Sequence, residues 1–150
     1  MYFDDLTEGV TFETGSRTLG RDDIVAFARR WDPQDFHLDE EAAAASPFGG
    51  LVASGFHTLL TAFVLTLEAD IWKEASMGSP GMEDIRWLKP VRPGDSLRAR
   101  ATVTGSRASS SRPDRGRTTI FYEVVNQTGE VVMSYTAIHI LRRRVQGPCR

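Results

Sequence analysis

The sequence contains almost no cysteine, since Cys149, near the C-terminus, is the only one in 150 residues. This count excludes an intrachain disulfide and a thiolate metal site. The sequence also lacks a long apolar run, because the longest, from Leu59 to Leu67, is far too short to span a bilayer. No positive stretch leads into an apolar segment at the start, so we expect no signal peptide. We therefore predict a soluble, cytoplasmic protein with no membrane partner.

A strong charge of either sign is also absent. The net charge of −2, with 25% of the residues charged, gives no reason to expect nucleic acid as a partner. Only two of the 18 basic residues are lysines, so arginine carries nearly all of the positive charge. A chain of 150 residues with 41% apolar residues has the usual size and composition of one globular domain. We expect a single domain over residues 1–150, with a frayed tail from Arg142 that is disordered over 143–150.

The first half of the chain predicts one strand followed by helices. Partial alternation and many threonines indicate a strand over Val10–Leu19. Apolar residues at helical spacing follow between Gly20 and Trp31, and Pro33 then turns the chain into a loop. A short Ala-rich helix is expected before Pro47. The next helix, Gly55–Trp72, is apolar on nearly every face, which predicts that it is buried on most sides.

The second half predicts an antiparallel sheet. Its expected strands are Met82–Leu88, Ser96–Thr104, Thr118–Val125 and Val131–Leu141. The last two are joined by a hairpin signal at 126–129, whereas 105–116 is expected to be a polar loop with a mobile tip. One all-round apolar helix with four or five antiparallel strands indicates an α+β fold, in which a curved sheet wraps around the long central helix. This is the hotdog arrangement.

The residues best suited to chemistry precede the central helix. Asp32 and His37 stand five residues apart in D-P-Q-D-F-H, and Ser54-Gly55 opens the helix. An acid and a base can hold a water, and the free N–H groups of a helix N-terminus can hold an oxyanion. Each residue also has a simpler interpretation. Asp before Pro often caps a turn, a lone His is often structural, Ser54 suits an N-cap, and Gly55 suits close packing.

This stretch resembles the hydratase signature of the MaoC-like (R)-specific enoyl-CoA hydratases. That family has an Asp, an Asn-Pro pair and a His five residues after the Asp, then a Phe, small residues and His-Gly at the start of the central helix. The corresponding positions here hold Asp32, Gln34, Asp35, His37, Phe48 and Ser54-Gly55. Further similarity at 89–95 (K-P-V-R-P-G-D) and 126–130 (N-Q-T-G-E) extends over most of the chain. Gln34, Asp35 and Ser54 depart from the family's Asn, Pro and His.

The resemblance implies a hydro-lyase that reversibly hydrates a 2-enoyl thioester of coenzyme A or of an acyl carrier to the 3-hydroxyacyl thioester, as in fatty acid metabolism. It implies that Asp32 and His37 activate the water and that the N–H of Gly55 holds the thioester oxyanion. The further candidate substrate-binding residues are Ser54, Gln34, Phe48 and His57. It also implies no cofactor, no metal, and a homodimer or dimer of dimers.

Two alternatives stay open. The first is a hotdog acyl-CoA thioesterase, although such enzymes commonly place a carboxylate on or near the central helix, and no acid lies between Gly55 and Leu67. The second is a non-catalytic acyl-thioester-binding protein in which the altered positions have abolished turnover. A metal site is not indicated, because His37, Asp39 and His57 match no zinc spacing. We expect His139 to be structural and the arginines of 105–117 to be solvated rather than bound to coenzyme A phosphates.

Overall fold

The computed structural model describes residues 1–144. In chain order its elements are η1 (Phe3–Asp5), β1 (Thr11–Glu13), β2 (Arg17–Thr18), α1 (Arg21–Trp31), α2 (Asp35–Leu38), α3 (Glu40–Ala45), α4 (Gly55–Glu68), η2 (Lys73–Ala75), β3 (Gly81–Trp87), β4 (Ser96–Ala108), β5 (Arg115–Val125) and β6 (Val131–Arg142). The strands pair antiparallel in the order β1-β4-β5-β6-β3, and β2 also pairs with β4.

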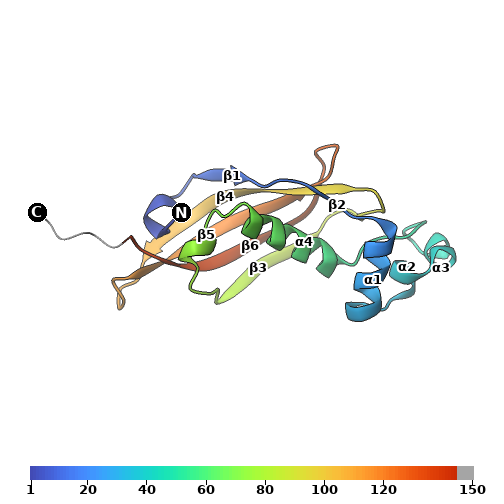
Figure 1. Cartoon of the computed structure of the whole chain (residues 1–150), viewed down its shortest axis with the longest axis horizontal. Helices are drawn as coiled ribbons and strands as arrows, with labels where there is room; N and C mark the ends of the chain where they lie inside the picture. Colours follow the sequence, from blue (N-terminus) through green and yellow to red (C-terminus); the bar gives the residue numbers. More distant parts are fainter. Residues whose placement is uncertain (145–150) are drawn as a thin grey trace, which may run out of the picture.

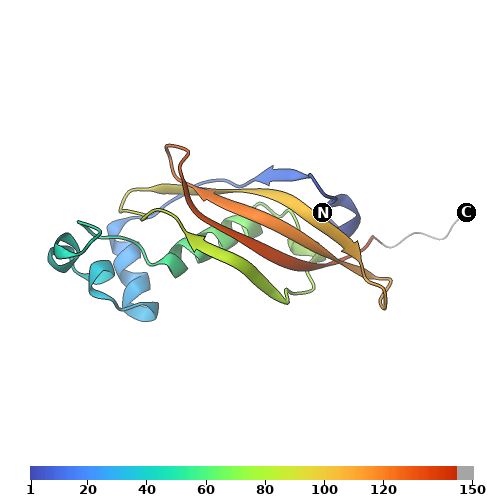
Figure 2. The same ribbon diagram turned by 180° about the vertical axis from the view of Figure 1, so that it is seen from behind.

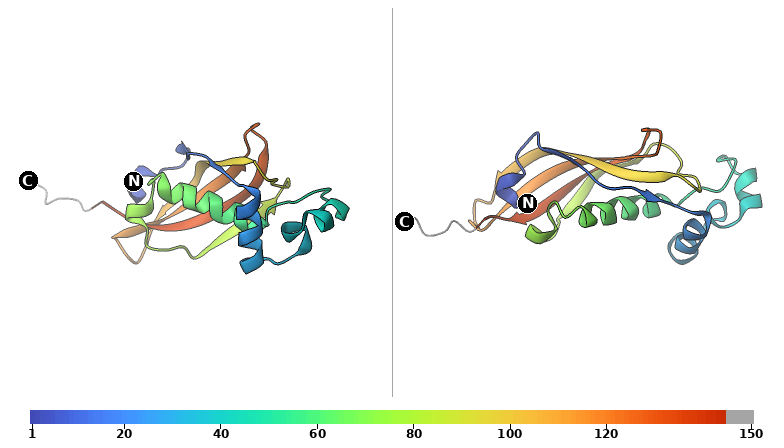
Figure 3. Two further views of the ribbon diagram at one scale, coloured as in Figure 1. Left: turned by 45° about the vertical axis from the view of Figure 1, so that its right-hand side comes forward. Right: turned by 45° about the horizontal axis from the view of Figure 1, so that its top comes forward.

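Helix α4 lies along one face of the curved sheet, while α1, α2 and α3 lie together beyond one end of it (Figure 1, Figure 3). No helix covers the opposite face of the sheet in the described part of the chain, and Figure 2 views the molecule from that side. This is the α+β hotdog arrangement that the sequence predicts. The three short helices therefore extend the fold at the end of the sheet where α4 begins.

Strand β4 shows how the side-chain pattern builds the sheet. Leu97, Ala99, Ala101 and Val103 are buried, whereas the arginines between them face outward. Arg100 stands opposite Glu123 of β5, and its Nε lies 3.0 Å from the Glu123 carboxylate. Alternation with period two thus gives this strand one face for the core and one face for cross-strand ion pairs.

The prediction of a polar loop over residues 105–116 is mostly wrong. Strand β4 continues to Ala108 and β5 begins at Arg115, so only residues 109–114 connect them. The reason is that this segment does have something to bury. The ring of Phe3 packs so closely over Gly116 that an added Cβ would lie 2.3 Å from it. Glycine is therefore required at position 116 for this close approach.

Three further boundaries differ from the predictions. The strand expected at Val10–Leu19 is split into β1 and β2, because both the backbone N–H and the hydroxyl of Thr14 bond to Ala99 and the chain then leaves the ladder. The central helix ends at Glu68, just before Asp70, whose φ of 53° is left-handed. The expected loop after Pro33 contains a one-turn helix, α2, which carries His37.

Helix α4 is not buried on most sides, which contradicts the prediction. Its buried residues are mainly small or hydroxyl-bearing: Thr58, Thr61, Ala62, Leu65 and Thr66. By contrast, Phe56, Leu60 and Phe63 are 57%, 48% and 43% exposed. The physical reason is that one sheet can cover only one side of a helix. The largest apolar side chains of α4 therefore remain on the outer surface.

The prediction of a frayed tail from Arg142 onward is wrong for residues 142–144. Residues 145–150 lie outside the described residues. Arg142 ends β6, and the guanidinium groups of Arg143 and Arg144 form ion pairs with Asp4 and Asp5 of η1. Partners from the other end of the chain therefore hold this segment in place. None of the helices within residues 1–144 combines the length and apolar character needed to cross a bilayer.

Candidate active site

The candidate site forms where four chain segments meet at the start of α4. Asp32 is the C-cap of α1 and donates its N–H to Ala28 O, and Pro33 prevents the helix from continuing. Helix α2 then turns the side chain of His37 inward, where only 5% of the residue is exposed. The returning chain runs beside it, because Val52 N donates to Phe36 O. Sequence-local turns therefore place the acid and the imidazole side by side.

Both oxygens of the Asp32 carboxylate are held by neighbouring side chains. Oδ2 accepts a hydrogen bond from Ser54 Oγ at 2.7 Å, and Oδ1 accepts one from Gln34 Nε2 at 2.6 Å. The same Oδ2 lies 3.3 Å from Nε2 of His37. Ser54 is fully buried and also accepts from Phe56 N, so it is the N-cap that the sequence predicts. Its contact with Asp32 is an additional role.

The proton positions on His37 follow from its partners. Nδ1 lies 2.6 Å from the carbonyl oxygen of Val52, and a carbonyl can only accept. Nδ1 therefore carries the hydrogen, and in the neutral ring Nε2 presents a lone pair toward Asp32. Two acceptors 3.3 Å apart need a proton between or beside them, which a water molecule or a protonated imidazole can supply. The pair is thus arranged to hold an O–H group.

The ionisation of Asp32 reflects competing effects. Burial raises the pKa of its carboxyl, but the hydrogen bonds from Ser54 and Gln34, together with the neighbouring His37, hold the net pKa below its ordinary value. The carboxyl is therefore ionised at neutral pH. A carboxylate that is fixed at both oxygens and stays charged is suited to accept a hydrogen bond from a substrate or a water.

A pocket of about 470 Å³ opens beside this pair. Its main lining residues are Asp32, Gln34, Phe36, His37, Phe48, Val52, Gly55, Phe56, Thr58, Trp87, Leu88 and Lys89. The N–H of Gly55 is the first of α4, and no residue among 1–144 accepts a hydrogen bond from it. An unpaired N–H at the positive end of a helix dipole is suited to hold an oxyanion. The pocket therefore combines a polar corner with a largely apolar wall.

Gly55 also has the packing role that the sequence left open. A Cβ at this position would lie 2.4 Å from Nε1 of Trp87, so the indole ring packs directly over the glycine. Trp87 itself is half-exposed and lines the pocket. The close approach of the ring requires glycine here whether or not the N–H binds a substrate.

The family model for the MaoC like domain matches residues 6–127. The chain belongs to the MaoC-like dehydratase family. A crystal structure of the MaoC-like dehydratase from Rhodospirillum rubrum is 39% identical, covers 97% of this chain and 99% of that one, and superposes with a TM-score of 0.91. The uncharacterized protein YdeM of Bacillus subtilis is 38% identical over 97 residues, which are 65% of this chain and 69% of YdeM. The 3-hydroxybutyryl-CoA dehydratase of Methylorubrum extorquens is 31% identical over 110 residues, 69% of this chain and 64% of that protein.

The structure brings six of the seven predicted site residues of this MaoC-like chain to the pocket or to Asp32. His57 is the exception, which corrects the prediction that it lines the pocket. Its ring stacks on Phe27 of α1 at 4.5 Å, and it is absent from the pocket wall. Successive helical residues are rotated by about 100°. Two positions after Gly55 the side chain therefore points away from the pocket, toward α1.

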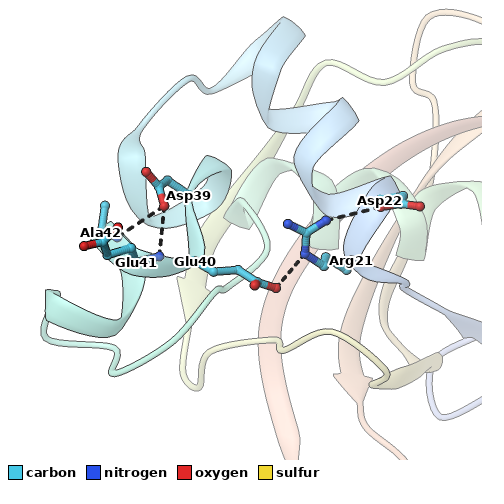
Figure 4. Close-up of polar contacts among 6 residues, drawn as sticks. All are labelled: Arg21, Asp22, Asp39, Glu40, Glu41 and Ala42. Atoms are coloured by element: carbon cyan, nitrogen blue, oxygen red, sulfur yellow. Dashed lines mark hydrogen bonds and ion pairs between the residues drawn. The ribbon is translucent and has the colours of Figure 1, made fainter.

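Asp39 has a structural role in the described chain. One oxygen of its carboxylate accepts hydrogen bonds from the N–H groups of Glu41 and Ala42, so it caps α3 (Figure 4). In the same region the guanidinium of Arg21 bonds to Glu40 and joins α1 to α3. Within residues 1–144 there is no group of three or more His, Cys, Asp or Glu side chains that could hold a metal ion.

Among the pocket residues that sequence reasoning missed in this MaoC-like domain, three carry a side-chain hydrogen-bond donor: Thr58, Trp87 and Lys89. Thr58 is buried, lines the pocket, and has a hydroxyl with no partner among residues 1–144, whereas Thr61 and Thr66 bond back to helix carbonyls. Its position one turn after Ser54 is a signal that could have revealed it. Trp87 ends β3 and Lys89 follows the strand, and only the tertiary fold brings them here.

Proposed function

We propose that this MaoC-like protein is a hydro-lyase that reversibly adds water across the double bond of a 2-enoyl thioester of coenzyme A or an acyl carrier protein. The observation that carries the proposal is the Asp32–His37 pair, whose facing acceptor atoms lie 3.3 Å apart at the wall of a pocket. The names of relatives support it, because one is a 3-hydroxybutyryl-CoA dehydratase. The product of hydration is the 3-hydroxyacyl thioester.

In the proposed reaction, Asp32 Oδ2 and His37 Nε2 accept hydrogen bonds from one water. The water oxygen bonds to C3 of the enoyl group as one of the two residues takes its proton, and the C2=C3 electrons move onto the thioester oxygen. A proton returned to C2 completes the hydration. General acid–base help of this kind gives roughly 100- to 10,000-fold. The N–H of Gly55 holds the developing enolate oxygen.

The departures from the family's signature are compatible with this proposal. Ser54 takes the position of the family's His and Gln34 that of its Asn, and each donates to one oxygen of Asp32. Their hydrogen bonds fix the carboxylate rotamer and keep it ionised. Ser54 and Gln34 therefore act as positioning residues for Asp32, while Phe48 and Gly55 line the space for the thioester.

The two rivals predict different products from one panel of enoyl- and acyl-CoA thioesters. A hydratase consumes the enoyl absorbance and releases no thiol, a thioesterase releases thiol, and a binding protein does neither. The fold supports the hydratase over the thioesterase, since α4 has no carboxylate before Glu68, which pairs with Arg17 at the surface. Thiol release with no hydration of crotonyl-CoA would refute the proposed function.

We also propose that the protein acts as a homodimer or a dimer of dimers. Phe56, Leu60 and Phe63 of α4 are exposed, and so are the large apolar residues of and just after β3: Met82, Ile85, Trp87 and Leu88. Within residues 1–144 strand β3 pairs only with β6, so its other edge is open in this part of the single chain. An open edge beside an apolar surface is suited to pair with the same strand of a second copy. That contact would cover the outer side of α4.

A further inference from the structure

A hollow of about 270 Å³ lies at the turn that joins β4 to β5. Its walls include Arg107, Ser109, Ser110, Arg115, Arg117 and Ile140. This turn lies at the end of the sheet opposite α1, α2 and α3 (Figure 1, Figure 2). Strand β4 has 13 residues and rises about 3.3 Å per residue, so the hollow lies roughly 40 Å from the other end of the strand. It shares no lining residue with the Asp32–His37 pocket.

Three strands contribute side chains to one row at this hollow. Arg107 of β4 stands directly opposite Arg117 of β5, which stands opposite Ile140 of β6. Gly116 and Thr118, on either side of Arg117, are buried toward the core. The side chain of Arg117 therefore points to the opposite face of the sheet. Directly opposite residues have Cβ atoms about 4.5–5.5 Å apart, so the two arginines are anchored side by side.

The two arginines lack the partners that arginines elsewhere on this face have. Like charges directly opposite each other destabilise a sheet. Arg100 of β4 instead stands opposite Glu123, with its Nε 3.0 Å from the carboxylate. Within residues 1–144 neither Arg107 nor Arg117 forms an ion pair. Residues 145–150 contain no Asp or Glu. The sheet thus holds two cations together with no side-chain carboxylate to neutralise them.

The nearest acid in the sequence is already paired. Asp114 is the only acid among residues 105–117, which contain four arginines. Both oxygens of its carboxylate accept hydrogen bonds from Arg115, at 2.9 and 3.1 Å. Asp114 and Arg115 therefore form a pair of their own, and the charge of Arg107 and Arg117 remains at the hollow.

Serine hydroxyls line the same hollow. Ser109 Oγ accepts a hydrogen bond from the N–H of Arg112 at 3.1 Å, which leaves the hydroxyl hydrogen free to donate. Guanidinium groups bind phosphate oxygens in pairs, and hydroxyls add further donors. Because a phosphate has several oxygens, these donors need to reach one group and not one atom. The volume lies just below the roughly 300–1,000 Å³ of pockets for drug-sized ligands, so it suits a small group.

We propose that this hollow binds a phosphate group, which the guanidinium groups of Arg107 and Arg117 neutralise and the hydroxyls of Ser109 and Ser110 hold. The phosphate has two possible sources, a free inorganic anion or the diphosphate of a nucleotide. The proposal does not rest on the proposed function. It replaces the expectation that these arginines are only solvated, and keeps the expectation that they do not meet the phosphates of a thioester bound beside Asp32.

The test uses the full chain and inorganic pyrophosphate as the probe, titrated at constant ionic strength and followed by calorimetry and NMR. We expect saturable binding that shifts the amide signal of Gly116. Arg107→Gln and Arg117→Gln should each weaken binding about tenfold to 100-fold, because each removes charge-assisted hydrogen bonds. Arg100→Gln is the matched control. It changes the net charge equally on the same face, but Arg100 has a carboxylate partner and lies outside the hollow, so the affinity should be unchanged.

Thermal unfolding gives a second measurement. Pyrophosphate should raise the unfolding midpoint of the wild-type protein and of Arg100→Gln, but not that of the double variant Arg107→Gln/Arg117→Gln. Both substituted arginines of the double variant are exposed, so it should retain the fold. A response that never saturates, as ionic screening alone gives, would overturn the proposal. An equal loss of affinity in Arg100→Gln, or NMR shifts confined to the signals near Gly55, would also overturn it.

ADP, pyrophosphate and adenosine separate the two sources. If the source is a nucleotide, ADP should bind more tightly than pyrophosphate, because the ribose and base add contacts. If it is a free anion, pyrophosphate should bind at least as tightly as ADP. Adenosine carries no phosphate, and adenosine binding equal to that of ADP would overturn the proposal. None of these measurements depends on turnover, so a failed hydration assay would refute the proposed function and leave the phosphate site to be decided by binding.

Discussion

Two histidines of this protein show what surroundings do to the same side chain. His37 donates from Nδ1 to a backbone carbonyl and faces the ionised carboxylate of Asp32. His139 accepts at Nε2 from the Tyr122 hydroxyl and has no carboxylate beside it. The Asp32–His37 pair borders a pocket with charged residues. His139 and Tyr122 instead line a cavity whose walls are mainly apolar. The first arrangement is suited to moving protons, whereas the second keeps its imidazole neutral.

The largest effect is expected from breaking the Asp32–His37 pair. Asp32→Asn and His37→Ala should each reduce the hydration of crotonyl-CoA by at least roughly 100-fold while the fold is retained, because the first removes the basic carboxylate and the second removes the imidazole. His139→Phe is the matched control, since His139 does not line the Asp32–His37 pocket. Near-normal turnover by either Asp32→Asn or His37→Ala would refute the assignment.

A second substitution tests the start of α4. Gly55→Val should reduce activity more than stability, roughly 100- to 1,000-fold if the thioester oxygen can no longer reach the N–H. Its side chain would also displace the ring of Trp87. The control combines Gly55→Val with Trp87→Ala. The double variant removes the clash with the indole ring, but the valine still keeps the thioester oxygen from the N–H. Recovery of the full rate in the double variant would mean that Gly55 serves packing alone.

The neutral histidine gives a prediction about pH. The folded pKa of His139 is about 4, below its ordinary value of roughly 6.5, so the unfolded chain binds a proton that the folded chain does not. The neutral His139 therefore stabilises the folded protein fully above pH 6.5. This contribution to the free energy of unfolding, about 3 kcal/mol, is lost as the pH falls toward 4. NMR titration should show His139 neutral at pH 5. An ordinary titration near 6.5 in the folded protein would contradict this.

Removing the hydroxyl that holds Asp32 should have a smaller effect. Ser54→Ala loses the N-cap of α4 and one hydrogen bond to the carboxylate, at a cost of about 1–2 kcal/mol in the free energy of unfolding at neutral pH. Because the folded pKa of Asp32 is lowered, its stabilisation is present above its ordinary pKa and is lost as the pH falls through the folded value.

The wild-type protein and Ser54→Ala should therefore differ less in their free energy of unfolding below about pH 3.5 than at pH 7. Ser54→Thr keeps a hydroxyl and serves as the control. A difference that is the same at both pH values would show that Ser54 acts as a helix cap only. Urea denaturation at several pH values provides the measurement.

The Asp32 cluster could be predicted from the sequence because its members lie within one stretch, where Pro33 ends a helix and Ser54 begins another. The strands could be predicted from alternation, as in β4. The hydrogen bonds that join Trp72, Tyr122 and His139 could not be predicted. The three residues come from separate parts of the chain, and each alone is an ordinary buried aromatic residue. Local patterns specify turns and faces, whereas strand register and the packing of η2 against the sheet decide which distant side chains meet.

The exposed face of α4 is where reasoning from the sequence failed, and it gives the last prediction. The helix is apolar all round, yet the sheet buries its threonines and leaves Leu60 outside. A second copy packed on this side would cover Leu60 and continue the sheet across the open edge of β3. Such an interface should exceed roughly 2,000 Å² and be obligate. Light scattering should then give about twice the chain mass of 16.7 kDa.

Leu60→Glu places a charge in the centre of that contact and should halve the mass, with a loss of thermal stability that depends on concentration. Trp31→Glu is the matched control, because Trp31 is also large, apolar and 63% exposed but belongs to α1 and not to α4 or β3. It should leave the mass unchanged. A wild-type monomer that is fully active would overturn the dimer, and the outer face of α4 would then need another partner to explain its composition.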